Sequence, residues 1–358
     1  MRPLTRLSFA LLLGLGLAMA LGALRAPAPA KADTTTLVFV NGRMTRVYFN
    51  DGDSFRLLDG PYASTSARLA GFNTLESFGP VHAWGSFHPY EIYVLAKEAT
   101  WHARRGVWHC GTDERRDGYG RLLLDCPDLA MSQIGRGFAH AMQINDRPSN
   151  AAYLRAQRQA QQARRGIWAH GIPGFILTSL HSFDEDPRRE WHYNRRVSTR
   201  DGHSESRRHR ETYRECEWVC EDELVVPAAE VTAVARAIRS TPGVAEAAAE
   251  IADNLLLETI VDRYARTQEM PAWFDVEEAE GRYDFIELSD ETKANARIVR
   301  DFLAEARARG DLSEPETVVG ACHLYTSFRR RFGRGQAPCL RGHGARPREL
   351  AAATGGGR

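Results

Sequence analysis

Lysine is almost absent from this sequence. Only three of the 47 basic residues are lysine, so arginine supplies nearly all of the positive charge. Net charge is almost absent as well, because the 47 basic residues face 46 acidic ones and leave a formal charge of +1. Such a chain has no overall field that draws it toward polyanions. Any attraction to nucleic acid must therefore be local, and the arginine count alone indicates no function.

The sequence also has no internal repeat, which excludes an architecture built from repeated units. Its 358 residues exceed the usual size of one domain, and a hydrophobic content of 43% is enough for packed cores. We therefore expect two domains.

The first 32 residues have the pattern of an export signal. Arginines flank the start of an apolar stretch at 7–24, and Ala30-Lys31-Ala32 is a small-x-small cleavage site. We predict cleavage near Ala32, a mature chain that begins at Asp33, and a secreted or periplasmic location. The alternative is an uncleaved membrane anchor, because the apolar stretch is close to the shortest length that spans a bilayer.

Six cysteines, an even number in an exported chain, indicate disulfides rather than free thiols. They lie as neighbouring pairs along the chain, and we prefer local pairing although six cysteines allow fifteen connectivities. The preferred bridges are Cys110–Cys126, Cys216–Cys220 and Cys322–Cys339.

Residues 33–173 are predicted to form short strands with inserted helices. Alternating apolar residues predict strands over 37–58, with a hairpin turn at Asn41-Gly42, then over 67–72 and on both sides of a charged loop in 107–126. Five short antiparallel strands with an inserted helix suit a closed β-barrel of the OB type. The predicted fold class is therefore α+β. Helical spacing predicts helices over 90–106, 129–137 and 150–166.

Residues 174–223 are predicted to be a charged linker or an ordered loop. From 184 to 223 charged residues and histidine alternate with few aliphatic residues, so little is available for a core. Residues 224–340 then predict an all-helical second domain, followed by a flexible tail at 341–358. The expected helices are 227–240, 243–268, 290–310 and 313–331, the last with a capping box formed by Ser313 and Glu316.

Four motifs within the barrel region occur in a recognisable order: DGD at 51–53, ARLAGFNTLE at 67–76, DGYGR at 117–121 and RRGIW at 164–168. In order and spacing they resemble the staphylococcal nuclease (thermonuclease) family over about residues 34–172. That family carries D-G-D-T on a strand, R-L-x-G-I-D-T-P-E, a helix, D-x-Y-G-R and a closing helix that ends in tryptophan. The resemblance implies an OB-type barrel and calcium-dependent endonucleolytic cleavage of DNA and RNA to 3′-phosphate ends.

Cleaving a phosphodiester bond requires a base for the attacking water and cations for the charge that develops on the phosphoryl oxygens. The resemblance assigns these catalytic roles to Arg68, Glu76 and Arg121. A carboxylate such as Glu76 can accept a proton from water. The planar guanidinium groups of Arg68 and Arg121 can hold phosphate oxygens at two points.

The resemblance also implies a calcium site made by Asp53, Asn73 and the backbone carbonyl of Thr74, with Asp51 in support. Oxygen ligands suit this hard cation. Two positions depart from the family pattern, since Asn73 replaces an aspartate and Leu75 replaces a proline. The amide removes a negative charge, and a unit pair at 4 Å is worth about 4 kcal/mol at an effective dielectric of 20. We therefore expect weaker calcium binding.

The base-binding wall departs from the family as well. Gln143 and Asn145 stand where the family has two tyrosines, so weaker base stacking is expected. Tyr119 keeps the family's tyrosine beside the arginine of DGYGR and is the predicted substrate-binding residue.

Each motif also has a plainer interpretation. Asp51-Gly52-Asp53 alone is an ordinary hairpin turn, and only the other motifs in register favour a site. A cluster of His203, His209, Cys216 and Cys220 is an alternative zinc site, but its spacing matches no standard pattern and an exported chain favours disulfides.

The leading hypothesis is an exported, calcium-dependent endonuclease that acts on DNA and RNA. A second hypothesis keeps the barrel as a non-catalytic module that binds nucleic acid or protein and has a weakened metal site. A third makes the helical region an inhibitor or a cell-surface attachment domain.

Overall fold

The computed structural model describes residues 35–77, 82–145, 147–186, 188–252, 254–271, 289–327 and 339. The predicted export signal at 1–32 and the predicted tail at 341–358 lie outside these residues. By its internal contacts the described part of the chain from Thr36 onward forms one compact unit, and the predicted domain boundaries at 173 and 223 fall inside it.

The first sheet begins with the predicted hairpin. Strands β1 (Thr36–Val40) and β2 (Arg43–Asp51) pair antiparallel, and the turn between them has Asn41 at φ 49° and Gly42 at φ 79°. These left-handed angles fit the type I′ turn, which the Asn-Gly pair favours. Alternate residues of both strands are buried, so one face of the hairpin belongs to the core.

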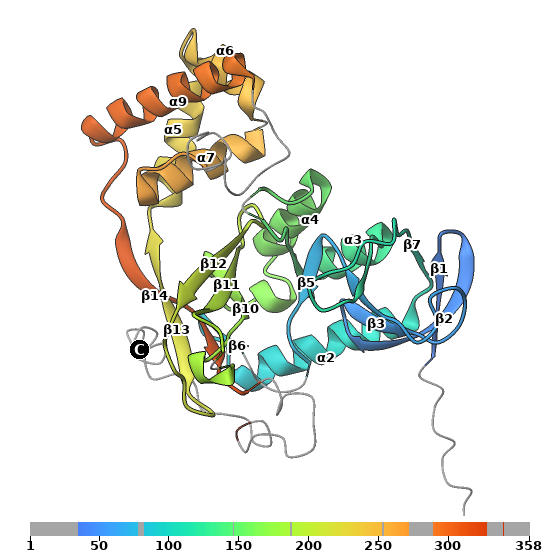
Figure 1. Cartoon of the computed structure of the whole chain (residues 1–358). Coiled ribbons are helices and arrows are strands. Elements are labelled where there is room, and N and C mark those ends of the chain that lie inside the picture. Colours follow the sequence, from blue (N-terminus) through green and yellow to red (C-terminus); the bar gives the residue numbers. More distant parts are fainter. Residues whose placement is uncertain are drawn as a thin grey trace, which may run out of the picture. The chain divides into compact units, whose positions relative to one another are not determined.

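Four further strands complete a strongly curled six-stranded sheet (Figure 1). They are β3 (Ser54–Leu57), β4 (Ser66–Leu69), β7 (Trp108–Cys110) and β8 (Leu122–Leu124), and the order across the sheet is β7-β1-β2-β3-β4-β8. Strand β4 pairs parallel with β8, and β1 pairs parallel with β7. Buried side chains from every strand form one core, including Val38, Val47, Phe55, Leu69, Trp108 and Leu122.

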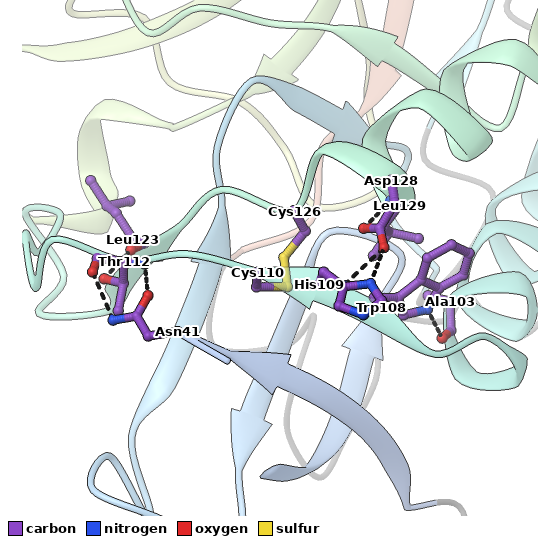
Figure 2. Close-up of a disulfide and its surroundings, with 10 residues drawn as sticks. All are labelled: Asn41, Ala103, Trp108, His109, Cys110, Thr112, Leu123, Cys126, Asp128 and Leu129. Carbon is purple, nitrogen blue, oxygen red and sulfur yellow. Dashed lines mark hydrogen bonds and ion pairs between the residues drawn. A yellow bond between two sulfur atoms is a disulfide. The ribbon is translucent and has the colours of Figure 1, made fainter. Parts of the chain in front are cut away.

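The two edge strands of this sheet are linked at one point. Gly111 and Asp125, which follow β7 and β8, exchange two backbone hydrogen bonds of 2.8 and 2.9 Å. The adjacent residues Cys110 and Cys126 form a disulfide (Figure 2). In the described residues, β7 and β8 themselves form no ladder. The mixed α+β class is confirmed, but a curled six-stranded sheet with linked edges stands where a closed five-stranded barrel was predicted.

The three helices predicted in this region are present within a few residues of their expected ends. They are α2 (Pro89–Arg105), α3 (Pro127–Gly135) and α4 (Ala151–Gln162). Helix α2 begins with a capping box between His88 and Glu91, which satisfies N–H groups of its first turn. Helix α3 leads toward β9 (Ala139–Ala141), which pairs antiparallel with β5 (Phe72–Thr74).

Residues 174–223 are not a linker. They contain β10 (Phe175–Ser179), β11 (His192–Ser198) and β12 (Ser204–His209), which form a three-stranded antiparallel sheet, and most of β13 (Trp218–Val225). The prediction was wrong because it counted aliphatic residues only. One face of β11 instead buries polar side chains that bond each other, as Asn194 Oδ1 does with His209 Nε2 at 3.0 Å.

The region after residue 226 is helical, as predicted, except at its end. Helices α5 (Ala228–Ser240), α6 (Val244–Ile251), α7 (Asn254–Thr267) and α9 (Asp290–Ala308) share a second apolar core. The helix predicted over 313–331 is wrong, because Glu316–Leu324 is strand β14. This strand pairs with β13 and, at its end, with β6 (His82–Ala83). Ser313, the expected cap, donates instead from its N–H and hydroxyl to Glu230, at 2.8 and 2.9 Å.

Three disulfides join all six cysteines. The predicted Cys110–Cys126 bridge is confirmed, but local pairing of the other four was wrong, since the bridges are Cys216–Cys339 and Cys220–Cys322. Cys220 and Cys322 face each other in the β13–β14 ladder, with Cα atoms 4.0 Å apart, so strand pairing decides their connectivity. Three disulfides indicate an extracytoplasmic protein. No helix in the described ranges is long and apolar enough to cross a membrane.

Candidate functional site

The turn between β2 and β3 presents two carboxylates. Asp51 Oδ1 accepts hydrogen bonds from the Ser54 hydroxyl at 2.6 Å and from the Asp53 backbone N–H at 3.4 Å. Gly52 lies against β5, where an added Cβ would approach Thr74 Cγ2 to 2.6 Å. Only glycine lets the turn pack this closely, and the close packing brings Asp53 beside the backbone of Thr74.

Asp53 is buried in the turn before β3, and its side chain contacts the next two strands, β4 and β5. Its Oδ2 accepts from the Thr74 backbone N–H at 2.8 Å, and its Oδ1 lies 2.5 Å from Arg68 Nη1. Arg68 Nη2 donates to Asn73 Oδ1 at 2.6 Å. The Arg68 guanidinium therefore bridges the two side chains that were predicted to hold calcium.

Asp51 and Glu76 add negative charge to this group. Burial raises the pKa of Asp51 well above its usual range, and the neighbouring charges of Asp53 and Glu76 raise it further. The Ser54 hydrogen bond and the Arg68 charge act in the opposite direction. The structure thus brings together three carboxylates and one guanidinium from the first two motifs, so the negative charge exceeds the positive charge when all of them ionise.

The amide of Asn73 has a fixed orientation. Its Nδ2 donates to the Thr74 carbonyl at 2.8 Å and lies 3.2 Å from His140 Nε2, on the strand paired with β5. Because Nδ2 can only donate, His140 Nε2 accepts, and the imidazole proton lies on Nδ1, 3.2 Å from the Ala141 carbonyl. Burial lowers the pKa of His140 to about 4, which keeps the ring neutral. Sequence reasoning missed this residue because nothing in Ala-His-Ala marks it.

Arg121 and Tyr119 lie one strand away. In the parallel β4–β8 pair Arg68 is opposite Leu123, so Arg121, two residues earlier, projects from the same face of the sheet as Arg68. In the described residues the contacts of the Arg121 guanidinium are with Asp117, at 2.7 Å, and with the Tyr119 ring, 5.5 Å from its centroid. The parallel register aligns Arg121 with Ser66 at the start of β4, and in the described residues no contact joins Arg121 to the three carboxylates.

The second sheet approaches the same loop. Partial burial and then a hydrogen bond with Tyr193 raise the pKa of Tyr119, while the charges of Arg195 and Arg121 lower it. Tyr193 and Arg195 lie on β11, in the segment that was predicted to be a linker. Their alternation with His192 and Asn194 is the strand signal that could have identified them.

Gln143 and Asn145, the positions expected to form the base-binding wall, are bonded to the second sheet through their backbone. The backbone N–H of Gln143 donates to the Gly202 carbonyl at 2.7 Å, and the N–H of Ser204 donates to the Asn145 carbonyl at 2.8 Å. Gly202 and Ser204 belong to the β11–β12 connection and its edge.

The oxygen donors of Asp53, Asn73 and Thr74 have the chemistry that calcium prefers. The unbalanced charge of the carboxylates also fits a divalent cation. However, no group of three or more His, Cys, Asp or Glu side chains in the described residues is arranged to hold a metal ion. The residues fit calcium by donor type and charge, and binding would have to change the contacts that Arg68 and Asn73 now make.

The alternative zinc cluster is contradicted by the disulfides, because Cys216 and Cys220 have no thiolate to offer. His203 is buried between Asp201 and Glu205, with its Nδ1 2.6 Å from Asp201 Oδ1 and its Nε2 3.0 Å from Glu205 Oε1. Although burial opposes the charged form, these two carboxylates raise the pKa of His203 to about 9. The group is a buried charged network in the β11–β12 hairpin.

No protein-family model matches this chain, and a search of curated proteins found none similar to it. The nuclease interpretation therefore depends on the motifs and on the geometry of the site.

Proposed function

We propose that the protein is an exported endonuclease that hydrolyses phosphodiester bonds of DNA and RNA. The observation that carries this proposal is the meeting of Asp53, Arg68 and Asn73 within hydrogen-bonding distance, with Asp51 and Glu76 in electrostatic contact. Arg121 on the same sheet face supports it.

The chemistry divides among the chain's own residues. Glu76 accepts a proton from water as the water oxygen forms its bond to phosphorus. The bond from phosphorus to the 5′ oxygen breaks, and that oxygen leaves as a hydroxyl after taking a proton from solvent. Arg68 and Arg121 stabilise the charge on the phosphoryl oxygens, and removing one such partner typically costs about 100-fold to 1000-fold in rate.

Calcium is the proposed cofactor, held by Asp53, Asn73 and the Thr74 carbonyl, with Asp51 nearby. When bound, it would align the phosphate and share its charge. The amide at position 73 carries no charge, so we propose a low-affinity site. Extracellular calcium sites work at roughly 0.1 to 1 mM, which makes such a site usable outside the cell.

The proposed architecture and location follow the same resemblance. The curled sheet would be an OB-type barrel, which the link between Gly111 and Asp125 supports. Cleavage of residues 1–32 would release the mature chain to the periplasm or the exterior, and the three disulfides support this route.

The test is cleavage of single-stranded DNA by the purified mature chain with calcium or with a chelator. The wild type should cleave only with calcium and leave 3′-phosphate ends, and Glu76→Gln should lose most of the activity. Glu98→Gln on the exposed face of α2 is the matched control and should keep it. Equal cleavage by wild type and Glu76→Gln, or no cleavage by either, would reject the proposal.

The contacts of Arg68 also favour a second candidate, a non-catalytic binding module. Its guanidinium occupies Asp53 and Asn73, so the oxygens are satisfied without a metal. Calorimetry separates the two candidates. No calcium binding at millimolar concentration, together with retained DNA binding, would favour the module.

A further inference from the structure

One face of the β11–β12 hairpin alternates aromatic and arginine side chains. Tyr193 is opposite Arg208 in the ladder and Arg195 is opposite Ser206, so these residues share a face. Trp191, two residues before Tyr193, has the same parity, and the Arg208 guanidinium lies 4.0 Å from its ring centroid. The Arg195 guanidinium lies 5.4 Å from the Tyr193 centroid. We call Trp191, Tyr193, Arg195 and Arg208 the hairpin face.

The two arginines of this face differ from their neighbours in charge pairing. In the described part of the chain, neither Arg195 nor Arg208 forms an ion pair. Neighbouring arginines do: Arg196 pairs with Glu205 at 2.6 Å, Arg207 with Glu211 at 2.8 Å and Arg210 with Glu190 at 3.5 Å. The hairpin face therefore carries positive charge that no carboxylate compensates, in a chain whose net charge is only +1.

The hairpin face continues into the loop that precedes β8. Burial and then the neighbouring Tyr193 raise the pKa of Tyr119, and the charge of Arg195 lowers it, so these residues adjoin the Tyr119 side chain. Tyr119 in turn stacks with Arg121, and its side chain is 67% exposed. Arg121 is also a proposed phosphate ligand. The hairpin face and the proposed catalytic site therefore adjoin at Tyr119 and Arg121.

Stacked aromatic rings beside unpaired guanidinium groups are the chemistry that binds single-stranded nucleic acid. Unpaired bases stack on aromatic rings, at about 1 to 3 kcal/mol per base, while arginines contact the backbone phosphates. In a duplex the bases already stack on each other and their faces are not available. The two positions that the resemblance assigns to a stacking wall, Gln143 and Asn145, are hydrogen-bonded through their backbone to the same hairpin.

From these observations we propose that the hairpin face, together with Tyr119, binds the part of a single-stranded nucleic acid that extends beyond the cleaved phosphate. The inference rests on the proposed nuclease function for the position of the cleaved phosphate, but binding is measurable without cleavage. The second sheet would thus replace the missing tyrosine wall with a surface of its own.

The experiment measures fluorescence anisotropy of a labelled 12-nucleotide single strand titrated with the full mature chain carrying Glu76→Gln. In that background, Arg195→Gln with Arg208→Gln should raise Kd at least tenfold. It should also reduce the magnitude of the slope of log K against log salt by about 1.4, since each phosphate contact on a single strand contributes about 0.7. The matched control, Arg207→Gln with Arg210→Gln, removes paired arginines of the same hairpin and should change Kd less than about twofold.

Folding and strand type are controlled separately. Arg208 is exposed, so Arg208→Gln alone should leave the thermal midpoint unchanged and still raise Kd. A DNA strand and an RNA strand of one sequence should bind alike, and the corresponding duplex should bind more weakly. Equal losses in both arginine pairs, no binding by the parent, or duplex binding as tight as single-strand binding would overturn the inference.

The proposed function fails independently of this result. If the wild type does not cleave but the hairpin variants weaken single-strand binding, the hairpin face binds single strands and the nuclease proposal is wrong. If the wild type cleaves and the hairpin variants bind normally, the nuclease proposal holds and the hairpin inference is wrong.

Discussion

At the scale of single residues, Gly52 determines how two carboxylates reach one site. Asp-Gly-Asp is a turn by composition, but the missing Cβ allows this turn to pack against Thr74 and fixes Asp53 on the Thr74 N–H. The turn and the site are therefore the same feature. An added Cβ at position 52 would lie 2.6 Å from Thr74 Cγ2, so a side chain there would force the Thr74 side chain to move.

Asn73 and His140 form a matched pair of donor and acceptor, which makes Asn73→Asp more than a change of charge. The new carboxylate should lower the calcium concentration for half-maximal cleavage at least tenfold, in line with the Coulomb gain of a unit charge. It should also move the His140 proton from Nδ1 to Nε2, because a carboxylate accepts where the amide donated. Nitrogen chemical shifts of the imidazole report this change.

The control for that variant is Asn150→Asp, at the start of α4, where aspartate caps the helix as well as asparagine does. It adds the same charge away from the site and should alter neither the calcium requirement nor the His140 proton. An unchanged His140 spectrum in Asn73→Asp would contradict the assigned hydrogen bond.

His203 predicts a pH dependence of stability. Its folded pKa is about 9, above the unfolded value of 6.5, so its stabilisation is fully present below pH 6.5 and is lost as the pH rises through 9. This pKa shift corresponds to a contribution from His203 on the order of 3 kcal/mol to the free energy of unfolding. Urea unfolding of wild type and His203→Gln should therefore differ most near pH 6 and least near pH 10. A constant difference across this range would show that the pairing with Asp201 and Glu205 carries no such charge.

At the scale of elements, local sequence signals identified the parts of the fold that depend on local chemistry. The β1–β2 hairpin follows from Asn41-Gly42, and α2 follows from helical spacing that ends before Gly106. The same rules failed at 316–324, where the segment pairs with β13 and with β6 far away in sequence. The prediction for residues 192–209 failed for a related reason, since side chains on other strands form hydrogen bonds with their buried polar groups.

The contacts of the candidate site were likewise predicted only in part. The motifs predicted that Asp53, Arg68 and Asn73 meet, because the resemblance assigns all three residues to one site. They did not predict that Arg68 would bridge Asp53 and Asn73, nor that His140 would hold the amide. Both contacts depend on the β5–β9 pairing and on side-chain geometry, which spacing alone does not determine.

The β13–β14 ladder predicts how the disulfides share stability. Cys220–Cys322 and Cys216–Cys339 join the same two segments, so either bridge alone still holds them together. Removing one bridge by paired Cys→Ala changes should lower the free energy of unfolding by about 3 kcal/mol, because the other bridge leaves only a short loop open. Removing both should lower it by more than the sum of the two single effects, because a loop of about 100 residues then opens. Denaturant unfolding measures these costs.

A non-reduced digest provides the matching check on connectivity. It should release Cys220 linked to Cys322, and Cys110 linked to Cys126. Peptides that contain a Cys216–Cys220 or Cys322–Cys339 bridge would contradict the β13–β14 register.

At the scale of the whole molecule, one buried cluster contains residues from both sides of the domain boundary predicted at residue 173. Trp84 and Trp168 share a buried cluster with Ile176 of β10 and Ala321 of β14. The 198–204 connection also binds the backbone of the segment after β9. The residues before 173 are therefore packed together with segments that follow them.

This packing predicts that a chain of residues 33–173 alone is much less stable than the mature protein. Truncation removes apolar partners of two tryptophans, and burying one such side chain is worth about 1.5 to 3 kcal/mol. The thermal midpoint and near-ultraviolet circular dichroism of the fragment should both fall. A fragment with the midpoint of the full chain would mean that the later segments add nothing to this core.

Arg68 and Arg121 contact different carboxylates in the structure, and we propose that both nevertheless act on one phosphate. The most direct measurement is a double-mutant cycle in kcat/KM for single-stranded DNA with Arg68→Lys, Arg121→Lys and both. Each single change should lower kcat/KM about 100-fold to 1000-fold, and the double variant should fall far less than the product of the two, because the groups act as a unit. Wild-type activity in Arg121→Lys, or fully multiplicative losses, would contradict the account.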